Sequence, residues 1–331
     1  MKYILIGGSG FIGSHFSEKL GESILVNYDI NSPDFSDEKY TELNILDKEK
    51  FLSQRLKINK KTTLIHLAAV HFDFQKKFYE TNVDGTRNVL NFVEKNNIEV
   101  FVFFSSVAIY GNSFKGKDEN SPKFPINDYG KSKYEAEKII KEWSKENPWC
   151  KVIIIRPAVV FGEKNFGNVY NLISQIKSKF YAIIGSGKNI KSIAYVKNVV
   201  DSVLFSIDNI ENMYFEYNYS DYPQITTGEL SKKICDILSI RYPFKIPLTL
   251  TYLITFPIDI LEKIFKRDMK FNSIRVKKFT DSTYFLSKKI RDNGFVPSFN
   301  IDKSLSNTIY WMSNNNVKKL RADWYSKAKK L

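Results

Sequence analysis

Tyr129 and Lys133 carry the first sign of chemistry, in the stretch DYGKSKYEAEK at residues 128–138. Residues four apart on a helix lie on one face, so these two side chains are expected to be neighbours. An ammonium close to a phenol favours the phenolate, and it would lower the tyrosine pKa from about 10 toward neutrality. Such a tyrosine can take a proton from a hydroxyl group while hydride leaves the same carbon. The pair therefore predicts acid–base catalysis of alcohol oxidation.

Four tyrosines are followed four residues later by a lysine: Tyr129, Tyr134, Tyr284 and Tyr325. The spacing alone is therefore not specific. Tyr134 lies about 140° around a helix from Tyr129, so the two cannot face one site. Position favours Tyr129, because it follows a strand-like run ending in Ser105 and Ser106, and the Ser106 hydroxyl can hydrogen-bond the reacting oxygen. We predict Ser106, Tyr129 and Lys133 as the catalytic residues.

A glycine-rich loop, GGSGFIG, supplies Gly7, Gly10 and Gly13 directly after the first apolar run and at the start of an expected helix. Glycine permits a tight turn and lets a pyrophosphate approach the backbone, while the helix N-terminus offers free N–H groups to the anion. Asp29 ends the second apolar run. A carboxylate there accepts hydrogen bonds from both ribose hydroxyls and repels a 2′-phosphate, so the loop predicts NAD rather than NADP.

Five short apolar runs alternate with amphipathic segments, and they lie at residues 2–6, 23–28, 63–67, 100–104 and 152–155. Continuous apolar runs are typical of strands buried on both faces, and residues 83–97 have the periodicity of a helix. This alternation predicts an α/β fold: a doubly wound parallel sheet of the Rossmann type. We expect an NAD-binding domain over residues 1–165 and a smaller, mostly helical substrate domain over 166–331. The chain is expected to return to the first domain near 190–205, with a strand at 193–196.

The positive charge is concentrated in the last 100 residues. Residues 232–331 contain 21 Lys and Arg against 8 Asp and Glu, whereas the whole chain has 50 and 36. Such a concentration indicates an acidic partner or, alternatively, a solvated basic face. Three histidines and two distant cysteines, Cys150 and Cys235, give no metal-ligand spacing and fit a reducing compartment, so no metal is predicted.

Within this basic region lies an apolar segment, KIPLTLTYLITFPIDILEKIFKR, at residues 245–267. Residues 246–258 carry no charge, but they are too few to span a bilayer and could lie in its interface. Cations follow at Lys263, Lys266, Arg267 and Lys270, then at Arg275, Lys277 and Lys278. One hypothesis is docking to an anionic membrane surface, and the alternative is that 245–270 forms core helices of the substrate domain.

Five motifs together resemble the extended short-chain dehydrogenase/reductase family of nucleotide-sugar epimerases, dehydratases and reductases: GGSGFIG, HLAA, SSVAIYG, YGKSK and RPAVVFG. The resemblance covers nearly the whole chain and implies the same catalytic roles for Ser106, Tyr129 and Lys133. It implies cofactor contacts from these residues: Gly7, Gly10, Phe11, Ile12, Gly13, Asp29, Leu67, Ala68, Asn82, Tyr129 and Lys133. Asn44 and Ile45 stand where the family usually has an acid that contacts adenine, and they are expected to make that contact more weakly.

Four further stretches are similar to one branch of that family: residues 162–176, 191–200, 273–279 and 294–299. The branch consists of bacterial 4-epimerases that act on N-acetylglucosamine carried on undecaprenyl diphosphate, for O-antigen and related glycans. The resemblance implies an NAD-dependent 4-epimerase working on the cytoplasmic face of the inner membrane, and a homodimer formed through the helix of Tyr129. Dehydration is not expected, because Val107 and Ala108 stand where dehydratases carry an acid–base pair.

Candidate substrate contacts are Ser106, Asn168, Lys191, Arg275 and His71. Lys191 occupies a position that usually holds a phosphate-binding arginine in the family, and His71 follows the cofactor strand. Three alternatives stay open: a soluble UDP-N-acetylhexosamine 4-epimerase, a membrane-surface dehydrogenase of the sugar or sterol type, and a non-catalytic NAD-binding module with a nucleic-acid-binding tail. The intact catalytic set and the lack of aromatic residues interleaved with a basic stripe argue against nucleic acid.

Overall fold

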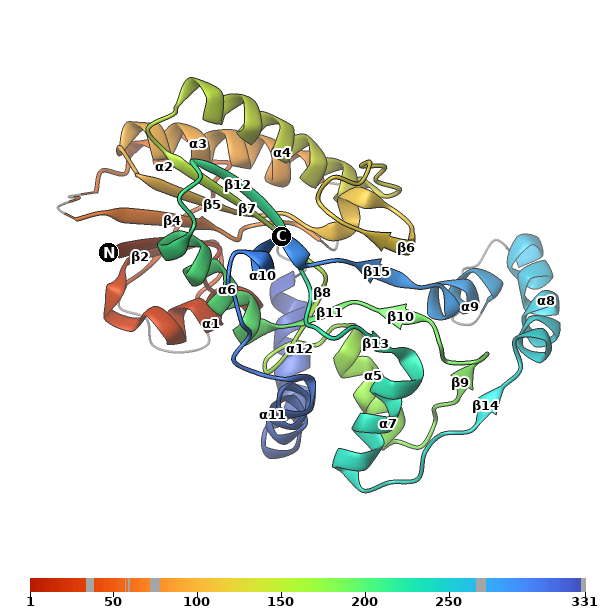
Figure 1. Cartoon of the computed structure of the whole chain (residues 1–331). Helices are drawn as coiled ribbons and strands as arrows, with labels where there is room; N and C mark the ends of the chain where they lie inside the picture. The colour runs from red at the N-terminus through yellow and green to blue at the C-terminus, as the bar shows by residue number, and fades with distance from the viewer. Residues whose placement is uncertain (34–38, 57, 59, 72–77, 266–271, 329–331) are drawn as a thin grey trace.

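The computed structural model describes residues 1–33, 39–56, 58, 60–71, 78–265 and 272–328. Its centre is a seven-stranded, fully parallel sheet with the order β12-β7-β5-β4-β1-β2-β3 (Figure 1). The strands are β1 (Lys2–Ile6), β2 (Ile24–Asp29), β3 (Tyr40–Glu42), β4 (Thr62–His66), β5 (Val100–Phe104), β7 (Lys151–Pro157) and β12 (Tyr214–Tyr219). The predicted doubly wound α/β fold is confirmed.

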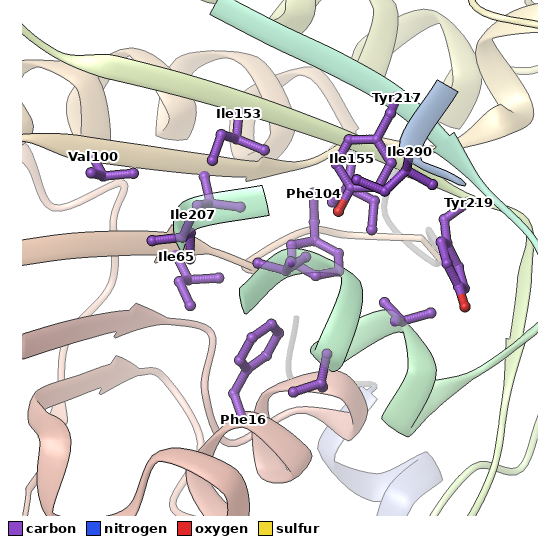
Figure 2. Packing of buried hydrophobic residues seen from close by; sticks show 14 of the residues in the cluster. Phe16, Ile65, Val100, Phe104, Ile153, Ile155, Ile207, Tyr217, Tyr219 and Ile290 are labelled. Atoms are coloured by element: carbon purple, nitrogen blue, oxygen red, sulfur yellow. The ribbon is translucent and has the colours of Figure 1, made fainter. Parts of the chain in front are cut away.

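The sheet is apolar on both faces because helices cover both. Helices α1 (Phe11–Leu20) and α6 (Val196–Asn209) pack on one face, and α2 (Lys48–Ser53), α3 (Gly85–Lys95) and α4 (Asp128–Glu146) on the other (Figure 1). Strand β5, VFVFF, is buried throughout. Val100, Val102 and Phe104 join the first core and Phe101 and Phe103 the second, as expected from the two-residue period of a strand. Figure 2 shows the first of these cores.

The strand expected at 193–196 does not join the central sheet. Strand β11 (Ile193–Tyr195) pairs instead with β8 (Val159–Phe161) in a separate two-stranded sheet. The chain returns through α6 and then through β12, which forms the edge of the large sheet. Sequence reasoning missed β12 because Glu216 and Asn218 interrupt its apolar run, whereas both are paired in the fold.

The second half of the chain forms smaller sheets and a helical layer. A four-stranded sheet has the order β13 (Ile225–Thr226), β10 (Ile190–Lys191), β15 (Thr283–Phe285), β6 (Ser113–Lys117), and β14 (Lys245–Ile246) pairs with β9 (Ile183–Ile184). The helices are α5 (Asn168–Lys177), α7 (Thr227–Leu238), α8 (Leu248–Phe265), α9 (Ser273–Thr280), α10 (Lys288–Asp292), α11 (Ile301–Asn314) and α12 (Val317–Ala328). Ile290 and Phe295 reach back into the first core. The division at residue 165 stays a prediction.

Helix α8 lies at the margin of the molecule, far from the central sheet (Figure 1). Over the described ranges, no helix combines the length and apolar character needed to cross a membrane. Cys150 and Cys235 are buried free thiols. In the same ranges no three His, Cys, Asp or Glu side chains gather into a metal-binding group.

Candidate active site

The glycine loop after β1 forms a cradle of bare backbone. Gly7 adopts φ +83°, and a Cβ atom on it would lie 2.5 Å from the backbone nitrogen of Ala68. A Cβ on Gly13 would lie 2.5 Å from the Cα of Gly8. Helix α1 begins at Phe11. Its N-cap residue is Gly10, which has no side chain to accept a hydrogen bond from the first N–H groups of the helix. Its first N–H groups are therefore available to an anion such as a pyrophosphate.

Asp29 lies beside this cradle at the end of β2. Its Oδ2 accepts a hydrogen bond from the Ser9 backbone N–H at 3.0 Å, and its Oδ1 accepts one from the Asn31 N–H at 2.9 Å. Burial raises the pKa of Asp29, and these backbone hydrogen bonds oppose the rise. A carboxylate next to a phosphate-binding loop fits the ribose of a dinucleotide. The residues present thus fit NAD.

A polar cavity of about 290 Å³ opens next to Asp29, lined by Ile30, Asn31, Glu42, Leu43, Asn44, Asp47 and Lys50. Asn44 is exposed there, and its Oδ1 accepts the backbone N–H of Leu46 at 2.9 Å. Ile45 is buried and packs where a Cβ on Gly85 would fall. An adenine contact from Asn44 and Ile45 stays a prediction.

Asn82 is buried in the one-turn helix Glu80–Asp84, where it braces the site. Its Oδ1 accepts the N–H of Val70 at 2.9 Å, and its Nδ2 donates to the Val70 carbonyl at 3.0 Å and to the Ser132 Oγ at 2.9 Å. Both amide hydrogens are used in these bonds. Asn82 thereby ties the loop after β4 to helix α4, and its contact with the cofactor stays a prediction.

Ser106, Tyr129 and Lys133 come together at the end of β5. Ser106 lies two residues after the end of the strand, and its side chain is hydrogen-bonded to that of Tyr129. Asn127 caps helix α4 by accepting the Gly130 N–H at 2.7 Å, which places Tyr129 in the first turn. Lys133, one turn later, is buried, and its Nζ donates to the Phe104 carbonyl at 2.8 Å. The structure therefore assembles the predicted trio.

The protonation of this trio differs from the expectation. Burial raises the pKa of Tyr129 to about 12, and the hydrogen bond with Ser106 opposes the rise. Burial lowers the pKa of Lys133 to about 7, and the carboxylate of Glu137 opposes that shift. The expectation that the Lys133 ammonium lowers the pKa of the Tyr129 phenol toward neutrality is wrong. The reason is that burial disfavours both charged forms and that Lys133 is directed to a carbonyl.

Arg156 links strand β7 to helix α4, which carries Tyr129 and Lys133. It is fully buried in β7, and its Nε and Nη2 donate to the two carboxylate oxygens of Glu137 at 2.8 and 2.7 Å. Nη2 also lies 2.9 Å from Glu216, and Nη1 donates to the Tyr110 hydroxyl at 3.0 Å. Sequence reasoning assigned Arg156 no role. The signal available was an arginine inside an otherwise apolar strand, which requires buried partners.

The candidate substrate residues are spread over two regions. His71 lies in the loop after β4, and its pKa is lowered to about 4 by burial and, to a smaller extent, by the charge of Lys133. Lys191 is half-buried in β10 and donates to the Asp281 carbonyl at 2.6 Å. Arg275 is exposed on α9, and Asn168 is exposed at the first position of α5. Their contacts with a substrate stay predictions.

The fold and the site together indicate the family to which this chain belongs. The chain belongs to the NAD-dependent epimerase/dehydratase family, whose model matches residues 3–218. It is 36% identical, over 93% of this chain and 94% of the other, to the N-acetyl-alpha-D-glucosaminyl-diphospho-ditrans,octacis-undecaprenol 4-epimerase of Escherichia coli O157:H7. It is 23% identical, over 94% and 97%, to a decarboxylating sterol-4-alpha-carboxylate 3-dehydrogenase of Candida albicans.

Among solved structures, the UDP-glucuronic acid 4-epimerase of Bacillus cereus in complex with NAD matches with a TM-score of 0.72. The match covers 95% of this chain and 99% of the other at 16% identity, and it therefore speaks for the fold. The predicted family, its NAD cofactor and the enzymatic character of the chain are confirmed by these similarities.

Proposed function

We propose that this protein is an NAD-dependent 4-epimerase that interconverts N-acetylglucosamine and N-acetylgalactosamine on undecaprenyl diphosphate, for surface-glycan synthesis. The similarity to the Escherichia coli enzyme over nearly the full length supports this substrate. The observation that carries the proposal is the exposed apolar face of α8, since a soluble nucleotide sugar gives no reason for such a surface.

The catalytic residues perform a reversible oxidation at C4. In its phenolate form, Tyr129 takes the proton of the 4-hydroxyl and becomes the neutral phenol, while the Ser106 hydroxyl hydrogen-bonds the same oxygen. The chemistry that NAD would supply in this site is reversible acceptance of the C4 hydride. The 4-keto sugar turns over before it is reduced on its other face, and Tyr129 gives the proton back to the oxygen. Val107 and Ala108 cannot transfer protons, so no water is expelled.

Helix α8 has its apolar residues on the outside. Among the α8 residues whose side chains are described, Thr251 and Thr255 are the buried ones, and Thr255 is fully buried. Each hydroxyl donates to a carbonyl of the helix region itself. The exposed side chains are Leu248, Leu250, Tyr252, Leu253, Ile254, Phe256, Ile260, Leu261 and Ile264. Leu253 is 73% exposed and Phe256 67%. Within the described residues, α8 contributes no side chain to a core cluster, which supports a surface helix over the alternative of a core helix.

The charges around α8 suit an anionic surface. Its acidic residues face α9, since Asp259 accepts the Ser273 N–H at 3.0 Å and Glu262 accepts the Asn272 amide at 3.0 Å. Arg275 and Lys277 are exposed on α9, next to the exposed Ile274 and Phe279. The docking hypothesis also included Lys266, Arg267 and Lys270, which lie outside the described residues. The side chains of Lys263 and Lys278 lie outside them too. An apolar helix beside exposed cations is typical of interfacial docking.

A vesicle experiment tests the docking. Wild-type protein and the triple variant Leu250→Ser, Leu253→Ser, Ile254→Ser are sedimented with phosphatidylglycerol vesicles. We expect the triple variant to bind at least about tenfold more weakly, because each leucine or isoleucine contributes through buried apolar area. The variant Val296→Ser, Tyr310→Ser removes equally exposed apolar side chains elsewhere and should bind as wild type does. Equal sedimentation of all three proteins would refute docking through α8.

A substrate comparison tests the carrier. UDP-N-acetylglucosamine and undecaprenyl-diphosphate-linked N-acetylglucosamine are offered side by side, and the C4 configuration of the products is followed. Turnover of the lipid-linked sugar alone, or in strong preference, is expected. Turnover of UDP-N-acetylglucosamine alone would establish the runner-up, a soluble UDP-sugar 4-epimerase, and net NADH formation without epimer would indicate a dehydrogenase.

Two further elements complete the proposal. We propose that Lys191 and Arg275 contact the diphosphate, that Asn168 contacts the diphosphate or the acetamido group, and that His71 lines the sugar site. The enzyme is proposed to work on the cytoplasmic face of the inner membrane. The protein is proposed to form a homodimer through helix α4. Sedimentation velocity of the purified protein tests the dimer, and a purely monomeric species at micromolar concentration would argue against it.

A further inference from the structure

Helix α12 is anchored beside the cofactor cradle by apolar contacts. Val317, Leu320 and Trp324 pack against the third core cluster, which is formed mainly by α5, α7 and α11. Phe11 and Ile12, the first residues of α1, pack against the same cluster. The C-terminal helix and the pyrophosphate-binding end of α1 therefore share one apolar core.

A polar contact holds the middle of α12. The Arg321 Nη2 donates to the Asn171 Oδ1 at 3.2 Å, and its guanidinium lies 5.4 Å from the ring centre of Tyr170. Both partners belong to α5. These contacts fix the rotation of α12 about its axis, and with it the direction of the side chains in its last turn.

The last turn of α12 reaches the loop that leaves β2. The Lys327 Nζ donates to the backbone carbonyl of Ser32 at 3.0 Å, and the Lys327 side chain is half-buried. Ser32 lies three residues after Asp29, whose carboxylate also accepts the Ser9 N–H of the glycine loop. Residues from opposite ends of the chain thus bring together the Lys327 ammonium, the carboxylate of Asp29 and the glycine loop.

We propose that α12 stabilises the adenosine end of the cofactor site, and that Lys327 is a specificity-determining residue for the cofactor. Its bond to Ser32 holds the loop after β2 against the ribose. Its positive charge offsets the carboxylate of Asp29, which lowers the repulsion that this carboxylate exerts on a 2′-phosphate. Burial raises the pKa of Asp29, and the charge of Lys327 is among the influences that oppose this rise. Helix α12 therefore helps to retain NAD, and Lys327 makes the site more tolerant of NADP than Asp29 alone would.

Cofactor titrations of the full-length protein test this proposal. Bound cofactor is removed, and the Kd values for NAD and NADP are measured by calorimetry at low salt for wild type, Lys327→Ala, Lys327→Arg and the control Lys318→Ala. Lys318 is an exposed lysine on the same helix. The Tm of each cofactor-free protein is recorded in parallel.

We expect Lys327→Ala to weaken NADP binding about tenfold more than NAD binding, because the 2′-phosphate then meets an unscreened carboxylate. Lys327→Arg should keep the wild-type ratio of the two Kd values, and Lys318→Ala should leave that ratio unchanged. NAD should dissociate faster from Lys327→Ala than from wild type. A ratio that is the same in Lys327→Ala and wild type overturns the proposal, whether or not the Tm falls. An equal loss of both cofactors together with a lower Tm would show a purely structural role.

Discussion

The Lys133 Nζ donates to the backbone carbonyl of Phe104 at 2.8 Å, and this bond joins the catalytic helix to the end of the central strand. Ser106 follows Phe104 by two residues, and Tyr129 precedes Lys133 by one helical turn. One buried hydrogen bond therefore sets the distance between the two segments that carry the catalytic hydroxyls. The Lys133 ammonium also lies 4.7 Å from the ring centre of Phe103, which leaves it little freedom.

Tyr129→Phe should lower turnover by about 10²–10⁴-fold, since it removes the proton-transferring oxygen. The ring, which lies 6.4 Å from that of Phe78, stays in place, so NAD content and Tm should be unchanged. C4 epimerisation is measured together with NAD released on denaturation. Tyr134→Phe, five residues along the same helix, is the matched control and should keep its activity. Wild-type turnover by Tyr129→Phe would mean that another group is the base.

The buried Lys133 should make the ligand-free protein more stable as pH rises. Its pKa is lowered from 10.5 to about 7 in the folded chain by burial. Between these values the unfolded state binds more protons, so the free energy of unfolding rises with pH by up to about 1.4 kcal/mol per pH unit. Below about pH 7 both states are protonated and this contribution is flat.

Urea unfolding of the cofactor-free wild type and of Lys133→Met at pH 7, 8 and 9 measures this effect. The difference between the two proteins should change steadily over that range, because the methionine cannot titrate. Lys131→Met, an exposed lysine two residues earlier, should run parallel to wild type. Parallel curves for Lys133→Met would show that the ammonium is not destabilised by burial.

Arg156→Met should cost about 3–5 kcal/mol of unfolding free energy, because it leaves Glu137 as a buried carboxylate without its two-point partner. Lys138→Ala breaks an exposed ion pair with Glu135 on the same helix and should cost less than about 1 kcal/mol. Equilibrium denaturation of both variants gives the comparison. Similar costs for the two would contradict a buried network that supports α4.

Gly13→Ala should destabilise the cofactor-free protein by about 1–3 kcal/mol and abolish NAD retention, since the new methyl would lie 2.5 Å from the Gly8 Cα and the backbone would have to move. Gly10→Ala places its methyl 3.4 Å from the Gly7 carbonyl oxygen, at an ordinary φ of −75°. It should fold with nearly wild-type stability. Urea unfolding and NAD content check both, and a stable Gly13→Ala that keeps NAD would disprove the tight packing of this loop.

The sequence by itself determined the features whose physics is local. Continuous apolar runs identified five of the central strands, because a strand buried on both faces must be apolar at every position. The glycine loop and Asp29 predicted NAD binding, and the spacing of Tyr129 and Lys133 together with the preceding strand-like run predicted the catalytic trio, since turn geometry and helix periodicity need only neighbouring residues.

Only the tertiary structure decided what depends on burial and on distant partners. In the apolar segment, the burial of Thr255 and the exposure of Leu253 could not be read from the sequence. The pKa of Tyr129 goes up rather than down, because the surroundings of a side chain come from many segments. Lys327 meets Ser32 across nearly the whole chain. Such contacts depend on how the helices pack on the sheet, and no local pattern encodes that arrangement.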